Sequence, residues 1–160
     1  MNRQDFIHLT TKHLEDLRRT LTALCCGDRM TADDLAQDSL LKAYIQIDTL
    51  KDAEKFRPWL MRIAYTTFLN SRRAIKPMES VDNATGIMTD TPADGSFHYQ
   101  ELYAALNRLT PMERTSVTLY YIEGYSIKEV AEIIGVKPDA VKQHIYRGRQ
   151  HLRTILSSHL

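Results

Sequence analysis

The side chains best suited to chemistry lie near the C-terminus of the chain, within residues 126–149. They are polar or basic: Lys137, Lys142, Gln143, Tyr146, Arg147 and Arg149. Gln143 and Arg147 have the geometry to hydrogen-bond base edges in a DNA major groove. The lysines and Arg149 are better suited to phosphate groups, which position a protein on the duplex. The pattern indicates a DNA-binding surface, with an ordinary solvated helix as the alternative.

Two helices joined by a tight turn would position this surface. Ser126 and, three residues later, Glu129 predict a helix start, because a hydroxyl and a carboxylate can each bond an unpaired backbone N–H. Gly135 can adopt a positive φ, which ends this helix and turns the chain. Val141 and Ile145 then recur at helical spacing and must face a core, so the polar side of the second helix points outward. The sequence predicts a helix-turn-helix.

The distribution of charge supports this interpretation. Between residues 137 and 153, five basic residues accompany a single acid, Asp139. The whole chain, by contrast, has a formal net charge of only +1. The positive field is therefore concentrated on the segment expected to meet DNA.

The composition limits the class of protein. The chain has 160 residues, 43% of them hydrophobic and 26% charged, which is enough for packed cores in one domain or two small ones. It contains no run approaching the roughly 18 apolar residues of a membrane span, and its N-terminus lacks the apolar core of a signal peptide. We therefore expect a cytoplasmic protein without direct membrane insertion.

Catalytic and metal-binding patterns are not found in the sequence. The six histidines are scattered, there is no glycine-rich phosphate loop, and no cysteine has a placed base partner. Cys25 and Cys26 are adjacent, which disfavours a disulfide between them and matches no zinc pattern, so buried free thiols are expected. The sequence predicts a protein that is not an enzyme and that uses no cofactor or metal.

The expected fold class is all-α, because no run of alternating Val, Ile, Thr and aromatic residues is bounded by turn residues. Apolar periodicity disappears between residues 76 and 97, where Pro, Gly, Ser, Thr, Asn and Asp accumulate. One base accompanies four acids in this segment. The sequence predicts two small helical domains, residues 1–75 and 98–160, joined by a flexible acidic linker, residues 76–97.

Three helices are expected in the first domain. The first ends near Gly27, and the second begins at Thr31 with Asp34 at the capping-box position. The third runs from about residue 56 to residue 74 and interleaves aromatic residues with arginines, a composition that suits single-stranded nucleic acid. Core packing is the alternative role for its Trp59.

Three segments of the chain, in this order, carry a resemblance to one protein family: TADDLAQDSLLKAY, FRPWLMRIAYTTFLNSRR and LNRLTPMERTSVTLYYIEGYSIKEVAEIIGVKPDAVKQHIYRGRQHL. The last is the most specific, with Leu109, Pro111, Glu113 and Arg114 ahead of an apolar helix, Glu123-Gly124-Tyr125-Ser126 and the helix-turn-helix. Together they resemble the bacterial RNA polymerase sigma factors of the extracytoplasmic-function (ECF) group. The resemblance covers nearly the whole chain.

The resemblance implies that residues 1–75 form region two, which in the family binds the polymerase clamp and melts the promoter -10 element. The residues that match the contact with the β′ clamp are Asp34, Leu35, Gln37 and Asp38. The residues implied to lie at -10 DNA are Arg57, Trp59, Arg62, Thr66, Asn70 and Arg73. The polar break at residues 48–55 falls where the family has the loop that captures a flipped base.

The rest of the chain, from about residue 97, would be region four, which in the family grips the -35 element and touches the β flap of core RNA polymerase. The residues expected at -35 DNA are Lys137, Lys142, Gln143, Tyr146, Arg147 and Arg149. Promoter DNA, core polymerase and an anti-sigma factor are the implied partners. The alternative function is a stand-alone helix-turn-helix regulator that binds duplex DNA as a dimer, and a nucleic-acid enzyme is a more distant one.

Several positions depart from the family pattern. Leu50-Lys51-Asp52 replaces a frequent Phe-Arg-Gly-like loop, and Thr66 stands where asparagine is frequent. Asp38 replaces a usual glutamate, Lys137 a hydroxyl residue at the helix start, and Gly148 a usual alanine. A helix-interior glycine costs roughly 0.5 to 1 kcal/mol, so Gly148 is expected to soften its helix.

Overall fold

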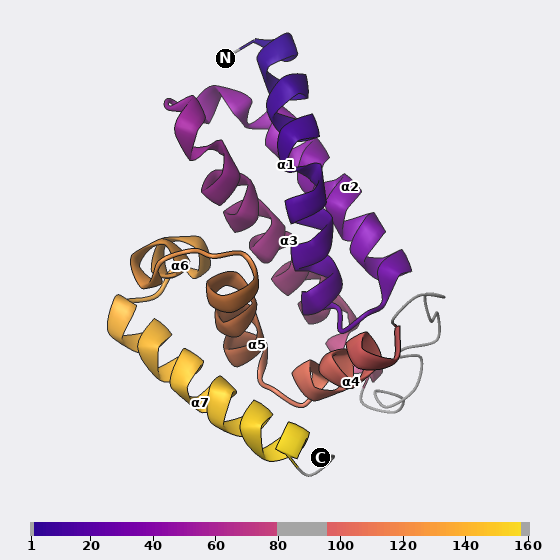
Figure 1. The fold of residues 1–160 in the computed structure, drawn as a ribbon. Helices are drawn as coiled ribbons and strands as arrows, with labels where there is room; N and C mark the ends of the chain where they lie inside the picture. Colours follow the sequence, from indigo (N-terminus) through magenta and orange to yellow (C-terminus); the bar gives the residue numbers. More distant parts are fainter. Residues whose placement is uncertain (1, 80–95, 158–160) are drawn as a thin grey trace.

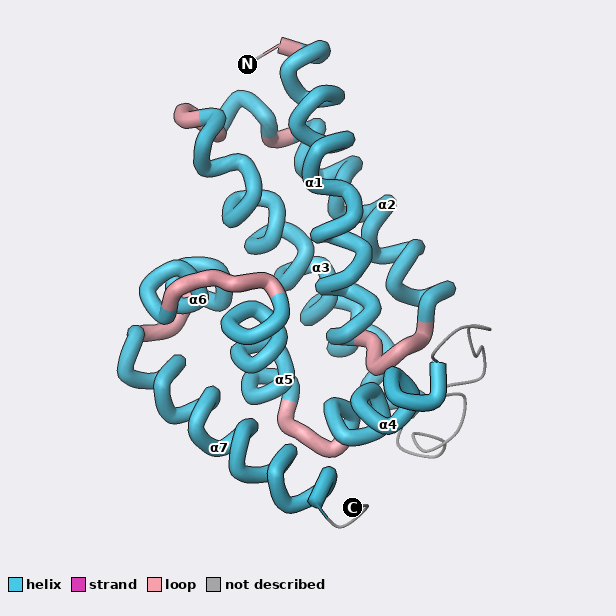
Figure 2. Tube along the Cα trace, viewed as in Figure 1, coloured by secondary structure: helices cyan, strands magenta, loops and turns pink. Residues whose placement is uncertain are grey.

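The computed structural model describes residues 2–79 and 96–157, and every regular element in these ranges is helical (Figures 1 and 2). The α-helices are α1 (Arg3–Leu24), α2 (Arg29–Ile45), α3 (Phe56–Glu79), α4 (Ser96–Asn107), α5 (Pro111–Val117), α6 (Ile127–Ile134) and α7 (Pro138–Ser157). Two short 3₁₀ turns, η1 (Ile47–Thr49) and η2 (Ala53–Lys55), connect α2 to α3. The predicted all-α fold is confirmed.

The predicted linker meets helices at both of its ends. Helix α3 extends to Glu79, past residue 76, where the linker was expected to begin. Helix α4 begins at Ser96. The remainder of the predicted linker, residues 80–95, lies outside the described residues.

Helices α1, α2 and α3 form a bundle around large apolar side chains (Figure 1). The most deeply buried of them are Leu17, Leu21, Leu24, Phe56, Leu60 and Phe68. Burying one such side chain contributes about 1.5–3 kcal/mol relative to leaving it in water. This packing makes the bundle a rigid support for polar side chains on the outer sides of α2 and α3.

The start of α2 differs from the prediction. Its N-cap is Asp28 rather than Thr31, because the Asp28 carboxylate accepts from the Thr31 backbone N–H at 3.2 Å and from its hydroxyl at 2.8 Å. Gly27, just before this cap, has a φ of 93°, which lets the chain turn sharply out of α1. Thr31 is therefore a donor within the first turn, and Asp34 lies outside the cap and is exposed.

The second half of the molecule is built on α5, α6 and α7. Its core includes Leu119, Val130, Ile133 and Val141, each 2% exposed or less. Between α5 and α6 lies a π-helical segment, η3 (Thr118–Ile122), in which the Glu123 N–H donates to the Thr118 carbonyl at 3.1 Å. A π-helical turn is wider than an α-helical one and often marks a functional position. Here it is followed by Glu123, which accepts hydrogen bonds from arginines of the first half of the molecule.

The two halves pack against each other, an arrangement that the sequence did not predict (Figure 1). Met61 and Tyr65 of α3 are 1% and 6% exposed and belong to the apolar cluster of α6 and α7. A second contact buries Ala23 of α1 with Leu106 and Leu109. The apolar surface of α3 is therefore wide enough to serve two cores at once.

Arg114 joins the two halves through hydrogen bonds from a buried guanidinium group. Its side chain is almost fully buried, and its guanidinium donates to the carbonyls of Leu106 at 2.9 Å and Leu109 at 3.2 Å. It also donates to the carbonyl of Leu24 at 2.9 Å, across the boundary between the halves. Burial lowers the pKa of Arg114. The three carbonyls accept the hydrogen bonds that the guanidinium N–H groups would otherwise donate to water.

Candidate nucleic-acid interfaces

The helix-turn-helix has the predicted caps. The Glu129 backbone N–H donates to Ser126 Oγ at 3.1 Å, and the Ser126 N–H donates to the Glu129 carboxylate at 2.9 Å. Gly135 has a φ of 77°, and its N–H donates to the Ala131 carbonyl at the end of α6. Both predictions are confirmed. The two ends of α6 are therefore held by local hydrogen bonds before any partner is present.

Helix α7 turns one side to the core and the other to solvent. Val141 and Ile145 are buried, as predicted. The exposed side carries Lys142, Gln143, Tyr146 and Arg147, which we call the recognition face. Arg149 is also exposed, and its Nη1 donates to the Tyr121 hydroxyl at 3.0 Å. The predicted outward orientation of these side chains is confirmed, whereas their contact with DNA stays a prediction.

Gly148 has a packing role, which corrects the expectation that it softens the helix. A Cβ added there would lie 2.7 Å from Val117 Cγ2, closer than side-chain carbons approach. Helix α7 continues without a break from Pro138 to Ser157. The glycine therefore lets α7 close tightly on α5, and this contact supports the recognition face from behind.

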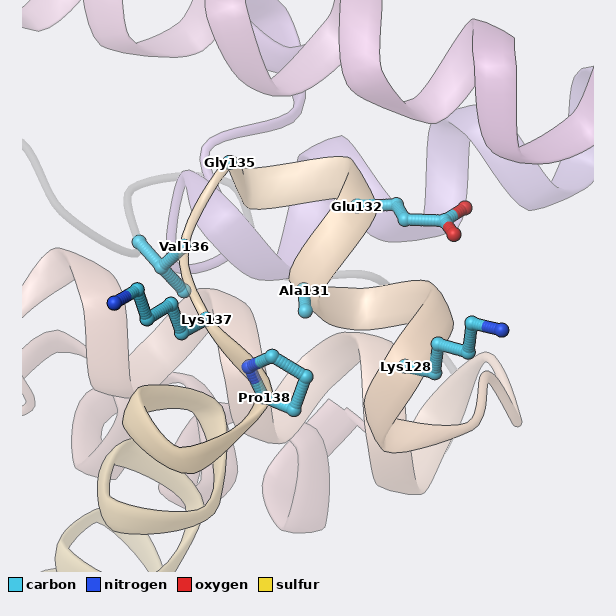
Figure 3. Close-up of a pocket in the computed structure, with 7 residues that line it drawn as sticks. All are labelled: Lys128, Ala131, Glu132, Gly135, Val136, Lys137 and Pro138. Atoms are coloured by element: carbon cyan, nitrogen blue, oxygen red, sulfur yellow. The ribbon is translucent and has the colours of Figure 1, made fainter.

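A hollow beside the turn of the helix-turn-helix is shown in Figure 3. Lys137 and Pro138 line it at the start of α7, and Lys128 and Glu132 line it from α6. In Figure 3 Lys137 extends to one side of the turn, while Lys128 and Glu132 extend to the other. Lys137 is exposed next to the positive end of the α7 dipole, a placement that favours a phosphate group.

The arginines expected at -10 DNA have a different environment. Arg57 is half-buried, and its guanidinium donates from Nε to Asp16 at 3.0 Å and from Nη2 to the Glu123 carbonyl at 2.9 Å. Its Cζ lies 4.3 Å from the centre of the Tyr125 ring. Glu123 and Tyr125 belong to the second half of the molecule, so Arg57 is held between the halves.

Arg62 is held by the same half of the molecule. Its Nη1 donates to the carbonyl of Glu132 at 2.8 Å and lies 3.3 Å from the carbonyl of Ile133. These carbonyls end α6, where the helix dipole favours a cation. Thr66 donates its hydroxyl to the Arg62 carbonyl within α3 at 2.9 Å.

The other residues expected at -10 DNA are either exposed on α3 or packed in the first core. Asn70 and Arg73 are exposed on α3, farther along the helix. Trp59 packs against the first core, with its ring 5.8 Å from that of Phe56, which supports the alternative of core packing. We call Arg57, Arg62, Thr66, Asn70 and Arg73 the -10 face.

Glu123 is the functional candidate that sequence reasoning missed. Its carboxylate is fully buried and accepts from Arg19 at 2.8 and 2.9 Å and from Arg57 at 3.3 Å. The hydrogen bonds that Arg19 donates to Glu123 raise the pKa of the Arg19 guanidinium. Burial opposes ionisation of Asp16, but hydrogen bonds from Arg19 and Arg57 hold the pKa of its carboxyl below the usual value. The sequence carried no signal for this network, because its members lie 66 and 104 positions apart.

Comparison with known proteins places both halves in one family. The models described as "Sigma-70 region 2" and "Sigma-70, region 4" match residues 9–76 and 99–152. The chain is 32% identical to RNA polymerase sigma factor CarQ of Myxococcus xanthus, over 78% of this chain and 74% of that protein. It is 30% identical to the ECF sigma factor SigE of Mycolicibacterium smegmatis, over 94% of this chain. The chain belongs to the ECF group of RNA polymerase sigma factors.

The solved structures agree with this assignment. Sigma factor RpoE of Bartonella quintana, determined in complex with the anti-sigma factor NepR, superposes with a TM-score of 0.83 at 25% identity. The match covers 96% of this chain and 98% of that one. The chain spans 61% of the length of the SigE relative. The stand-alone regulator, which would not need region two, is therefore not favoured.

The residues matched to the polymerase clamp lie along α2 of this sigma factor. Asp34, Gln37 and Asp38 are exposed, so their side chains are available to a partner. Leu35 is 5% exposed and packs in the first core, so its contact with the clamp stays a prediction. Its role is to hold α2 in the bundle beneath the exposed acids.

The remaining sequence expectations concern thiols, metals and membranes. Cys25 and Cys26 are free thiols, Cys26 buried and Cys25 half-buried, and burial raises the pKa of the Cys25 thiol to about 12. Among residues 2–79 and 96–157, no group of three or more His, Cys, Asp or Glu could hold a metal ion. No helix in the same ranges has the length and apolar character to cross a membrane.

Proposed function

We propose that this chain reads the promoter -35 element with the recognition face of α7. The observation that carries this is the division of α7 into a buried apolar side and an exposed side of amide, aromatic and cationic groups. Gln143 and Arg147 would bond base edges, because their forked groups match the paired donors and acceptors of the major groove. Lys137, Lys142 and Arg149 would hold phosphates and set the register.

Region two would open the -10 element and hold one strand. Arg57, Arg62 and Arg73 supply cations along one helix, and Thr66 and Asn70 supply hydrogen-bonding groups between them. Unstacking a base costs a few kcal/mol, and contacts of this kind must offset that cost. The rigid α1–α3 bundle supports the proposal, because strand capture needs side chains that are held in place.

Core RNA polymerase is the proposed scaffold for both DNA contacts. Asp34, Gln37 and Asp38 would meet the β′ clamp, where exposed acids steer association with a basic partner. Region four would touch the β flap. The protein would then act in the cytoplasm without catalytic chemistry of its own, because polymerase supplies the reaction. An anti-sigma factor is a further proposed partner, since the RpoE relative was solved with NepR.

The test is run-off transcription with purified core polymerase and genomic promoter fragments. We expect promoter-specific transcripts that require this protein, and weak binding to duplex DNA when polymerase is omitted. No such transcripts, together with no binding to core polymerase, would overturn the proposal.

A further inference from the structure

Arg149 has a side-chain partner, which sets it apart from the neighbouring cations Lys142 and Arg147 within residues 2–79 and 96–157. Its Nη1 donates to the hydroxyl of Tyr121 at 3.0 Å, and Tyr121 lies 28 positions earlier in the chain, within η3. Both side chains are exposed. A bond between two exposed side chains exchanges with water, so it contributes little to folding, and its main effect is on the position of the guanidinium.

The Tyr121 ring is supported from the core of region four. Leu119 is buried in this core, and the half-buried Tyr120 packs against it. The rings of Tyr120 and Tyr121 meet edge to face, with centroids 5.0 Å apart and an angle of 86° between their planes. This is a preferred geometry of aromatic pairs. A tyrosine has only two side-chain torsions to fix, whereas a free arginine loses much more rotamer freedom. Tyr121 is therefore the rigid member of its bond with Arg149.

Arg149 lies at one edge of the recognition face. It follows Lys142 by seven residues of α7. Seven residues are close to two helical turns, so the two cations share one line along the helix, about 10 Å apart along its axis. Gln143 and Arg147, which we propose to bond base edges, lie farther round the helix from this line. A line of cations beside base-reading groups suits the phosphates that border a major groove.

The bond to Tyr121 leaves Arg149 able to bind an anion. A guanidinium has five N–H donors, and this bond uses one of them. Four donors stay available to a phosphate, for which the guanidinium fork is well suited. Because Tyr121 restricts the rotamers of Arg149 before DNA arrives, less conformational freedom is lost when the phosphate contact forms.

We propose that Tyr121 is a positioning residue for the -35 contact, and that it holds the Arg149 guanidinium at the edge of the recognition face for a phosphate of the DNA backbone. The inference rests on the proposed role of Arg149 in -35 binding. A phosphate contact fixed in this way sets the register in which Gln143 and Arg147 meet the bases. The π-helical segment η3 thus takes part in promoter recognition, although it lies outside the helix-turn-helix.

Three variants of the full-length chain, each assembled with core polymerase, test this. Tyr121→Phe removes the hydroxyl that accepts from Arg149 and keeps the ring that packs on Tyr120. Arg149→Ala removes the cation, and the double variant carries both changes. Tyr99→Phe is the control, because it removes the hydroxyl of another exposed tyrosine, on α4. Thermal melting followed by circular dichroism verifies that each variant folds as the parent does.

Fluorescence anisotropy measures the affinity of each holoenzyme for a labelled promoter duplex, taken from the fragments that give transcripts in the run-off assay. A series of KCl concentrations gives the salt dependence, whose slope reports the number of phosphates neutralised. We expect Tyr121→Phe to bind about three- to tenfold more weakly with the slope of the parent, because no charge is lost. Arg149→Ala should bind at least as weakly and reduce the slope by about one. In the Arg149→Ala background, Tyr121→Phe should change the affinity less than about twofold. Tyr99→Phe should match the parent.

The contrary outcomes separate this inference from the proposed function. Unchanged affinity for Tyr121→Phe, with a normal effect of Arg149→Ala, would overturn the inference alone. A loss for Tyr121→Phe that persists in full in the Arg149→Ala background would show that Tyr121 does not act through Arg149. Unchanged affinity and slope for Arg149→Ala would remove that residue from the -35 contact and the inference with it. An equal loss for Tyr99→Phe would also overturn the inference. If no fragment gives promoter-specific transcripts, the proposed function and the inference fall together.

Discussion

The two faces that we propose to bind DNA use similar side chains but differ in what surrounds them. On α7 the Arg147 side chain points into solvent beside Lys142 and Gln143. On α3 the guanidinium groups of Arg57 and Arg62 are bonded to region four. The side chains of the recognition face are thus free of such bonds to the other half, whereas Arg57 of the -10 face is half-buried between the halves and Arg62 is bonded to region four at an exposed position. Residue type alone does not decide which arginine is available.

The two faces also depend on different forces. The recognition face is held by close packing of α7 on α5 at Gly148, and His151 of α7 lies 3.1 Å from the Glu113 carboxylate of α5 at the same contact. The contact of α1 and α3 with the second half combines apolar packing with a buried carboxylate between two arginines. A packing change at Gly148 should therefore disturb the recognition face, and a charge change at Glu123 should disturb the contact between α3 and the second half.

The largest effect should follow from Arg147→Ala. Loss of one bidentate base contact costs about 1–3 kcal/mol, so we expect transcription from a cognate promoter to fall by roughly 10- to 100-fold. Binding to core polymerase and the radius of gyration of the free protein should not change. Run-off transcription and a core-binding assay measure the two effects. Arg108→Ala, an exposed arginine outside α7, is the matched control. Loss of core binding would mean that this side of α7 meets polymerase instead of DNA.

A smaller effect is expected from Gly148→Ala. The added methyl group would meet Val117, and overpacking costs about 1–3 kcal/mol, against roughly 1 kcal/mol that alanine gains over glycine in a helix interior. We expect a lower melting temperature by circular dichroism and weaker -35 binding in the holoenzyme. Thr154→Ala, at an exposed position of the same helix, controls for helix propensity. A melting temperature above that of the parent would contradict the packing role.

The smallest effect concerns acid. The pKa of Asp16 lies below its ordinary value of 3.8 in the folded protein, so its contribution to stability is complete above that pH and is lost as the pH falls through the lower, folded value. Its charged neighbours are Arg19, Arg57 and, when protonated, His13. The melting temperatures of parent and Asp16→Asn should differ near neutral pH and converge once the pH has fallen below the lowered pKa of the folded carboxyl. The carboxyl is partly exposed, so the difference should be small. A difference that persists in acid would assign it to packing.

Much of the local structure could be predicted from the sequence. Ser126, Glu129 and Gly135 act on neighbours a few positions away, so their capping and turning roles follow from residue type and spacing. The outward side of α7 follows from the period of Val141 and Ile145 for the same reason. The start of α2 was predicted wrongly because two capping residues, Asp28 and Thr31, compete within one turn, and only the geometry shows which accepts.

The contacts between the halves could not be predicted in this way. Met61 and Tyr65 lie outside the apolar stripe that one bundle requires, and periodicity does not say that a second core is present. The pairing of Glu123 with Arg19 spans 104 positions, and many acids and bases of the chain offer alternative pairs. Leu35 was assigned to a polymerase contact because the family motif includes it, although its neighbours in the bundle bury it.

The π-helical segment η3 makes the length of the chain before Ser126 as important as its side chains. Each residue added to or removed from a helix rotates everything beyond it by about 100° around the axis. Deleting one residue within Thr118–Ile122 to restore an α-helical turn would swing Glu123 away from Arg19 and Arg57 and carry the helix-turn-helix with it. Substitutions in η3 should thus be tolerated far better than single-residue insertions or deletions, which would rotate the helix-turn-helix relative to the first half of the molecule.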